Sequence, residues 1–199
     1  TTKMNEVSKA LQSRLMSGIT SGLHRSGQLY VSKNGCEYCD FSVGDVDSNS
    51  LMQWFSATKP FAAVAIGQLW ERGLLELDQH VSEILPDFAV NGKNAITIRH
   101  LLTHTSGFRS IIDLESDIEA WDQTIRRVCD SRIENKWIPG EKAGYQIRSS
   151  WFILAEIIRC LDGRSFDIYV REEIFVPLSM DDCWISMNRE LSAEYGDRL

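Results

Sequence analysis

The sequence has no long apolar run and no excess of basic residues, and each absence excludes a class of function. No stretch approaches the roughly 18 consecutive apolar residues that a membrane-spanning helix needs, so we expect no membrane span. The net charge is −7, and acidic residues are spread along the 199 residues. A nucleic-acid-binding protein needs a basic face that neutralises phosphates, so nucleic acid is not an expected partner.

Cysteines are few and odd in number, with five in the chain. An odd number disfavours a complete disulfide framework and favours a reducing compartment. The sequence also shows no N-terminal signal peptide, so we expect a cytoplasmic protein. A trimmed N-terminus would instead fit a secreted or periplasmic protein.

Cys36 and Cys39 are close enough in sequence to suggest a metal or redox site. Residues 29–33 and 38–43, joined by an Asn-Gly pair, are typical of a β-hairpin. On a strand, positions 36 and 39 point to opposite faces, so the two thiols cannot share a metal. Zinc would also need a second ligand pair, and none has suitable spacing. We therefore expect no metal and no cofactor, with Cys39 in the core.

The most informative stretch is residues 54–60, where Ser56 precedes Lys59 by three positions at the head of an apolar segment. Side chains three apart on a helix lie on one face, with Cβ atoms about 5–6 Å apart. A lysine amine in that position can take the proton of the hydroxyl and make it a nucleophile. The positive end of the helix would face the resulting oxyanion. Taken alone, the pattern also fits a helix N-cap serine beside a solvated lysine.

The segment that follows, residues 61–70, has apolar residues on nearly every face, which predicts a helix buried on all sides. Pro60 disfavours α geometry at Lys59. The regular helix therefore begins near Pro60, or residues 56–59 form a tight first turn. We favour the tight turn because it keeps the two side chains together.

Further segments accompany this motif in a fixed order. They are residues 70–78, the Arg-His-Leu-Leu-Thr-His-Thr-Ser-Gly run at 99–107, Pro139-Gly140 with Tyr145, and residues 174–180. In that order they resemble the serine β-lactamase-like, penicillin-binding-protein-like hydrolases, a family that includes class C β-lactamases, esterases, D-amino-acid peptidases and transacylases. The resemblance covers about residues 28–187. It implies an α/β (α+β) fold of the β-lactamase/transpeptidase type, here a helix-rich part with an N-terminal β-hairpin.

The resemblance also implies roles for individual residues. Ser56 matches the acyl-forming nucleophile, Lys59 the lysine that activates it, and Tyr145 the tyrosine of a Tyr-x-Asn motif. The third position of that motif is Ile147 here, so an amide that contacts substrate in lactamase members is missing. This departure argues against an efficient β-lactamase and suits the esterase and transacylase branches. Without the resemblance, Tyr145 would be read as an ordinary half-buried aromatic.

Side chains near these motifs are candidates for the substrate pocket, although large aromatics fill cores more often than pockets. We expect Phe55, Gln146 and Trp151 to bind substrate. Trp54 and Trp137 are further candidate wall residues.

The family's third motif, Lys- or His-x-Gly on a late strand, is not visible before Leu199. That strand carries a second oxyanion donor in the family, and losing one such donor typically costs about a hundred- to a thousandfold in rate. The resemblance therefore predicts an N-terminal portion whose missing C-terminal strands come from a C-terminal remainder or a companion chain. We expect a serine hydrolase or acyltransferase that takes a small-molecule ester or amide as acyl donor. The alternative is a catalytically silent binding or structural subunit.

The spacing of apolar residues and the residues that end helices predict the secondary structure of the rest of the chain. Apolar residues at helical spacing predict an amphipathic helix over 3–20, and further helices are expected over 151–161 and 166–175. Residues 1–73 are assigned to the α/β domain, and residues 74–199 to a mainly helical domain with the start of the return to the first.

Two histidines complete the candidates for chemistry. His100 and His104 stand four apart on a short helix that Thr97 could cap, an arrangement known from zinc peptidases. No glutamate lies between them to act as general base. We therefore expect both histidines to brace the structure.

Overall fold

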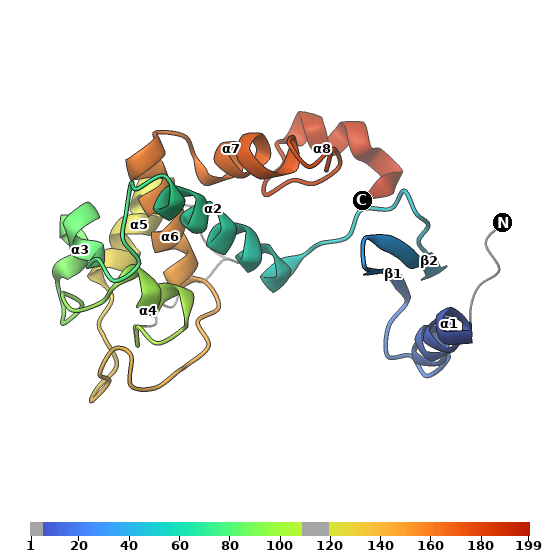
Figure 1. Cartoon of the computed structure of the whole chain (residues 1–199), viewed down its shortest axis with the longest axis horizontal. Helices are drawn as coiled ribbons and strands as arrows, with labels where there is room; N and C mark the ends of the chain where they lie inside the picture. Colours follow the sequence, from blue (N-terminus) through green and yellow to red (C-terminus); the bar gives the residue numbers. More distant parts are fainter. Residues whose placement is uncertain (1–5, 109–119) are drawn as a thin grey trace. The chain divides into compact units, whose positions relative to one another are not determined.

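The computed structural model describes residues 6–108 and 120–199 (Figure 1). Its helices and strands are α1 (Glu6–Thr20), β1 (Ser26–Lys33), β2 (Cys36–Gly44), η1 (Phe55–Thr58), α2 (Lys59–Glu71), α3 (Val81–Ile84), η2 (Pro86–Ala89), α4 (Ile98–Leu102), α5 (Trp121–Asp130), α6 (Ser149–Asp162), α7 (Phe166–Val170), η3 (Arg171–Phe175), α8 (Arg189–Tyr195) and η4 (Gly196–Arg198). No helix among the described residues is long and apolar enough to cross a membrane.

The chain forms two compact units, one of residues 1–53 with 187–199 and one of residues 54–186. The division expected from the sequence, at residue 73, concerns how the chain is shared between the domains of the family's fold. It stays a prediction.

The first unit is built on the predicted β-hairpin. Strands β1 and β2 are antiparallel and pair from Ser26 opposite Gly44 to Lys33 opposite Cys36. The connecting Asn34 and Gly35 have φ angles of 54° and 75°. Positive φ at both central residues is what a tight two-residue hairpin turn requires. Helix α1 packs against β2.

A register shift between Val31 and Ser32 places an extra residue in β2 before Cys39. This bulge interrupts the strict alternation from which we expected Cys36 and Cys39 to face opposite sides. The two thiols differ in exposure instead: Cys39 is buried, as predicted, and Cys36 is exposed. Both are free cysteines, and within residues 6–108 and 120–199 no cluster of His, Cys, Asp or Glu could hold a metal ion.

The second unit is organised around α6, which contacts α2, α4, α5 and α7 (Figure 1). Four aliphatic side chains along α6 are fully buried: Ile153, Leu154, Ile157 and Ile158. The helix ends where the sequence predicted, because Gly163 adopts a left-handed conformation with φ 91°. The core of this unit therefore runs along α6.

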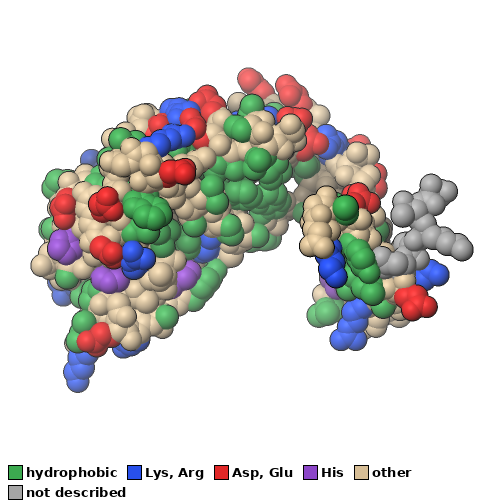
Figure 2. All heavy atoms as spheres, viewed as in Figure 1, with side chains coloured by type: hydrophobic (Ala, Val, Ile, Leu, Met, Phe, Trp, Pro, Cys, Tyr) green, Lys and Arg blue, Asp and Glu red, His purple; other side chains and the backbone are tan. Residues whose placement is uncertain are grey.

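Helix α2 packs on α6 and also contacts α7 and η3. Its buried residues are Ala62, Ala65, Ile66 and Leu69. Val64 and Trp70 are each 49% exposed, and Figure 2 shows hydrophobic side chains at the surface over α2. The prediction of burial on all sides is wrong for the described chain, because apolar composition permits burial but only a packing partner produces it.

Candidate active site

Ser56 lies on the 3₁₀ turn η1, which leads directly into α2. The turn spans Phe55–Thr58 and Lys59 is the first residue of α2. Pro60 follows within the first helical turn, where its missing N–H is tolerated. The favoured prediction of a tight first turn is therefore confirmed. The turn places Lys59 Nζ 3.0 Å from Ser56 Oγ, to which the amine donates a hydrogen bond.

Phe55, immediately before Ser56, has a left-handed φ of 43°. A bulky residue in that region is a backbone outlier, and such outliers persist only where the surroundings hold them. They cluster at functional sites. The backbone at Phe55 thus points to the same turn as the Ser56 and Lys59 side chains.

Tyr145 reaches the same hydroxyl from a loop 89 residues further along the chain, and its O–H donates to Ser56 Oγ at 2.7 Å. The hydrogen bonds with Ser56 and then Lys59 lower the pKa of Tyr145, burial opposes them, and the nearby Lys59 charge lowers it further. A lowered pKa makes the phenol oxygen easier to deprotonate. Ser56 therefore lies between two groups that can exchange its proton.

The loop that carries Tyr145 is held by His104. The Gly144 N–H donates to the His104 carbonyl at 2.9 Å, and the Gln146 N–H donates to His104 Nδ1 at 3.0 Å. The imidazole ring lies 4.8 Å from the Tyr145 ring, centroid to centroid. His104 thus fixes the residues on both sides of Tyr145 and the phenol ring itself.

His104 lies beyond α4, which ends at Leu102, and has a left-handed φ of 58°. His100 remains in α4, where its backbone N–H donates to Thr97 Oγ1 at 3.3 Å, so Thr97 caps the helix as predicted. The expectation that both histidines share a helical face is wrong, because the chain leaves the helix between them. The predicted bracing role is confirmed for His104 by its contacts with the Tyr145 loop.

Burial, and then the positive charge of Lys59, lower the pKa of His104 from its ordinary value. The imidazole is therefore neutral near pH 7. A neutral ring is required here because Nδ1 accepts a hydrogen bond and cannot carry a proton at the same time.

Gln146 is buried, and its side chain is occupied by hydrogen bonds to neighbouring serines. Its Nε2 donates to Ser106 Oγ at 2.8 Å, and its Oε1 accepts from Ser150 Oγ. The Gln146 carbonyl accepts from Trp151 Nε1 at 3.1 Å. The side chain therefore holds the Tyr145 loop against Ser106 and Ser150. Its predicted contact with substrate stays a prediction.

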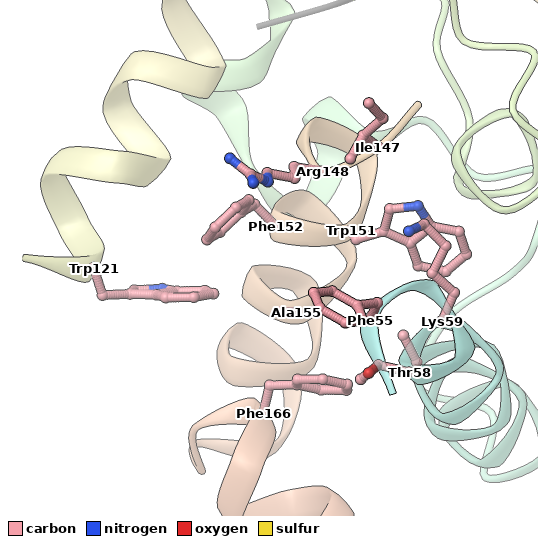
Figure 3. Close-up of a pocket in the computed structure, with 11 residues that line it drawn as sticks. Phe55, Thr58, Lys59, Trp121, Ile147, Arg148, Trp151, Phe152, Ala155 and Phe166 are labelled. Atoms are coloured by element: carbon pink, nitrogen blue, oxygen red, sulfur yellow. The ribbon is translucent and has the colours of Figure 1, made fainter. Parts of the chain in front are cut away.

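An apolar cavity of about 210 Å³ adjoins Lys59 (Figure 3). Its lining residues are Phe55, Thr58, Lys59, Ala62, Trp121, Ile147, Arg148, Trp151, Phe152, Ala155 and Phe166. Phe55 and Trp151 are thus found at the cavity wall. Of the other candidate wall residues, Trp54 stacks on Phe61 with ring centroids 4.8 Å apart, and Trp137 is buried and donates to the Thr105 carbonyl at 3.0 Å.

Trp121, Phe152 and Phe166 line the cavity but were not expected there from the sequence. Phe152 and Phe166 belong to apolar segments that predict buried helix faces, and helical periodicity does not distinguish a core contact from a cavity wall. The sequence marks Ile147 only as the position of a missing amide. Its side chain is 65% exposed and lines the cavity.

Comparison with known proteins identifies relatives of this chain. A family model described as Beta-lactamase matches residues 8–196. Penicillin-binding protein 4* of Bacillus subtilis (strain 168) is 31% identical over 154 residues, which is 74% of this chain and 33% of that protein. Esterase EstB of Burkholderia gladioli is 29% identical over 196 residues, 88% of this chain and 48% of that protein. The chain thus spans about a third to a half of the length of these relatives.

Solved structures give the same result for the fold. A penicillin-binding protein homologue from Caulobacter crescentus superimposes with a TM-score of 0.79 at 26% identity, covering 100% of this chain and 54% of that one. This likeness confirms the β-lactamase/transpeptidase-like fold predicted from the sequence.

Proposed function

The chain belongs to the β-lactamase family, and from that premise we propose that it is part of a serine hydrolase that forms an acyl-enzyme on Ser56. One observation carries the proposal. The Ser56 Oγ atom accepts hydrogen bonds from both Lys59 Nζ, at 3.0 Å, and the Tyr145 hydroxyl, at 2.7 Å. A hydroxyl held in this way has a proton acceptor beside it once either of the two partners is deprotonated.

In the proposed reaction, Ser56 Oγ attacks the carbonyl carbon of the substrate while its proton passes to Lys59 or Tyr145. Backbone N–H groups of the turn stabilise the oxyanion of the tetrahedral intermediate. The bond to the leaving alcohol then breaks, and the alcohol takes up the transferred proton. Attack by water on the acyl group returns free Ser56. Attack by an acceptor alcohol or amine gives an acyltransferase by the same route.

Esters are the proposed substrates, ahead of amides and β-lactams. Ile147 presents an apolar side chain at the cavity wall, where the resemblance to lactamase members leads one to expect an amide. An apolar group there offers no hydrogen bond to a polar amide substrate. One of the relatives, from Burkholderia gladioli, is an esterase. The proposed small-molecule partner is therefore an apolar ester.

Labelling of the full-length protein with a fluorophosphonate tests the proposal. We expect covalent modification of the wild type, located at Ser56 by peptide mapping, and none in Ser56→Ala. Ser13→Ala, which changes an exposed serine of α1, is the matched control and should label like the wild type. A folded protein that no fluorophosphonate modifies would instead support a catalytically silent binding or structural role.

A further inference from the structure

The cavity beside Lys59 is lined on one side by Trp121, the first residue of α5, which is 37% exposed. Figure 3 shows the indole directed across the cavity toward Ala155 on α6. Its ring centroid lies 5.6 Å from that of Phe152. Trp121 and Phe166 also line a second cavity, of about 240 Å³. These two aromatic side chains therefore form a partition between two spaces.

The partition is anchored by Glu156, a carboxylate that the proposed chemistry does not use. Glu156 is only 4% exposed, and its Oε2 accepts from Trp121 Nε1 at 2.6 Å. Arg159 donates to the same carboxylate at 2.8 and 2.6 Å. A buried carboxylate needs such partners, and hydrogen bonds to an ionised group are stronger than those between neutral groups. The bond to Glu156 therefore holds the Trp121 indole in one orientation.

The charge on Glu156 follows from the balance of its surroundings. Burial by itself raises the pKa of the carboxyl, but the hydrogen bonds from Arg159 and Trp121 outweigh burial and keep the pKa below its ordinary value. Glu156 is therefore ionised at neutral pH and acts only as an acceptor. The Glu156 carboxylate therefore accepts the hydrogen bond from Trp121 throughout the neutral pH range.

The size and lining of the cavity limit what it can hold. A cavity of about 150 Å³ lined by apolar side chains accommodates benzene. The 210 Å³ beside Lys59 therefore suffices for one aromatic ring with a short linker, or for a short alkyl chain. Apart from Lys59, Arg148 and the Thr58 hydroxyl, the lining side chains are apolar.

From this arrangement we infer that the cavity binds the apolar group of the ester substrate, and that Trp121, positioned by Glu156, sets the largest group accepted. The inference rests on the proposed function. The substrate class is an ester that carries one aromatic ring or a short alkyl chain on its acyl or its alcohol side. Larger groups meet the indole, and the adjoining 240 Å³ stays separate from the first cavity.

The inference predicts a break in chain-length selectivity. Each methylene that enters the cavity contributes about fourfold in kcat/KM, because burying one CH₂ is worth about 0.8 kcal/mol. In the wild type this gain ends when the chain reaches Trp121. In Trp121→Ala the two cavities join, so the gain continues to longer chains. Ala155→Leu fills the cavity from the opposite wall and should move the break to shorter chains.

The experiment measures kcat/KM of the full-length protein for two series of substrates. The acyl arm uses p-nitrophenyl esters from acetate to decanoate together with phenylacetate. The alcohol arm uses acetate esters of alcohols of increasing size. The arm in which Trp121→Ala and Ala155→Leu shift the break identifies which side of the ester occupies the cavity. A melting curve for each variant reports whether it is folded.

Trp70→Ala is the matched control for Trp121→Ala. Trp70 also donates its indole N–H to a glutamate, Glu76 Oε2 at 3.3 Å, and it lines neither cavity. We expect wild-type selectivity from this variant.

Glu156 has its own test, because it acts through Trp121. Glu156→Ala removes the acceptor and should raise kcat/KM for long esters relative to short ones, mainly through KM. Glu156→Gln keeps an acceptor oxygen and should restore most of the wild-type break. If Glu156 had only a structural role, both variants would lower kcat/KM for all substrates together, and Glu156→Gln would behave like Glu156→Ala.

The two levels of the proposal fail in different ways. If acetate esters are hydrolysed but the break lies at the same chain length in the wild type, Trp121→Ala and Ala155→Leu in both arms, the inference is overturned and the proposed function stands. If no ester is hydrolysed and Ser56 is not labelled in any folded form, the proposed function is overturned and the inference falls with it.

Discussion

Lys59 and Tyr145 contact the same oxygen atom, but their positions have different origins. Lys59 is three residues from Ser56 on one continuous turn, so local backbone geometry brings the pair together. Tyr145 is 89 residues away, and its loop is held by His104, which is 42 residues from Gln146. One side of the site is thus a local structure and the other depends on tertiary packing. Changes far from Ser56 should therefore disturb the Tyr145 side and spare the Lys59 side.

Of the changes that test this comparison, removal of the Lys59 amine should lower activity the most. Lys59→Met keeps an unbranched apolar stem but removes the group that contacts Ser56. We expect kcat/KM for an activated ester to fall at least about a thousandfold, as for other residues that activate a nucleophile. The control is Lys142→Met, because Lys142 is an exposed lysine whose amine lies 4.5 Å from the centre of the Trp137 ring. A loss of less than tenfold in Lys59→Met would contradict the assigned role.

Tyr145→Phe should have the next largest effect. The change removes the O–H that contacts Ser56 and leaves the ring that packs on His104, so the loop stays in place. A positioned proton-transfer group typically contributes about 10²–10⁴ in rate. We expect a loss in that range in steady-state ester hydrolysis, with an unchanged melting temperature. Tyr30→Phe, at an exposed tyrosine of β1, provides the comparison. Wild-type rates in Tyr145→Phe would show that the phenol contacts Ser56 without taking part in proton transfer.

His104→Ala tests the part of the site that depends on tertiary packing, and it leaves Ser56, Lys59 and Tyr145 themselves unchanged. The Gln146 N–H loses its acceptor and the Tyr145 ring loses its neighbour. A displacement of about 1 Å can cost about a hundredfold in rate, so we expect a fall of ten- to a hundredfold. His104→Asn should recover part of it, because asparagine tolerates the left-handed φ of 58° and carries an acceptor. His80→Ala should behave like the wild type. Equal effects of His80→Ala and His104→Ala would remove the special role of His104.

Acidification should weaken the Tyr145 side alone. The pKa of His104 is lowered in the folded protein, first by burial, so the folded state binds its proton less readily than the unfolded state. The stabilisation by the neutral ring is complete above the ordinary value of 6.5 and is lost as the pH falls through the lower folded pKa. Melting temperature and activity should both decline in that window, and His104→Asn should show a flatter profile. An identical acid profile in His104→Asn would assign the decline to another group.

Local features of the fold were predictable from the sequence, and features that depend on packing were not. The Asn34-Gly35 turn, the end of α6 at Gly163 and the turn from Ser56 to Lys59 each follow from a few neighbouring residues. The exposed face of α2 could not be predicted, because apolar composition does not say which face meets a partner. The bulge before Cys39 and the end of α4 ahead of His104 also depend on contacts that a periodic pattern does not contain.

The candidate site divides in the same way. The motifs and their family resemblance singled out Ser56, Lys59 and Tyr145, and the structure brings all three together. The cavity wall formed by Trp121 and Phe166 had no sequence signal, because helices distant in the chain supply it. Gln146 was expected to contact substrate, but its hydrogen bonds to Ser106 and Ser150 became visible only in the folded chain.

The most direct measurement is the mass of the full-length protein quenched within the first turnover of a p-nitrophenyl ester. We expect one acyl group per chain, located on Ser56 by peptide mapping, with slower formation in Lys59→Met and Tyr145→Phe. Ester hydrolysis without an adduct, an adduct on another residue, or undiminished hydrolysis by Ser56→Ala would contradict it.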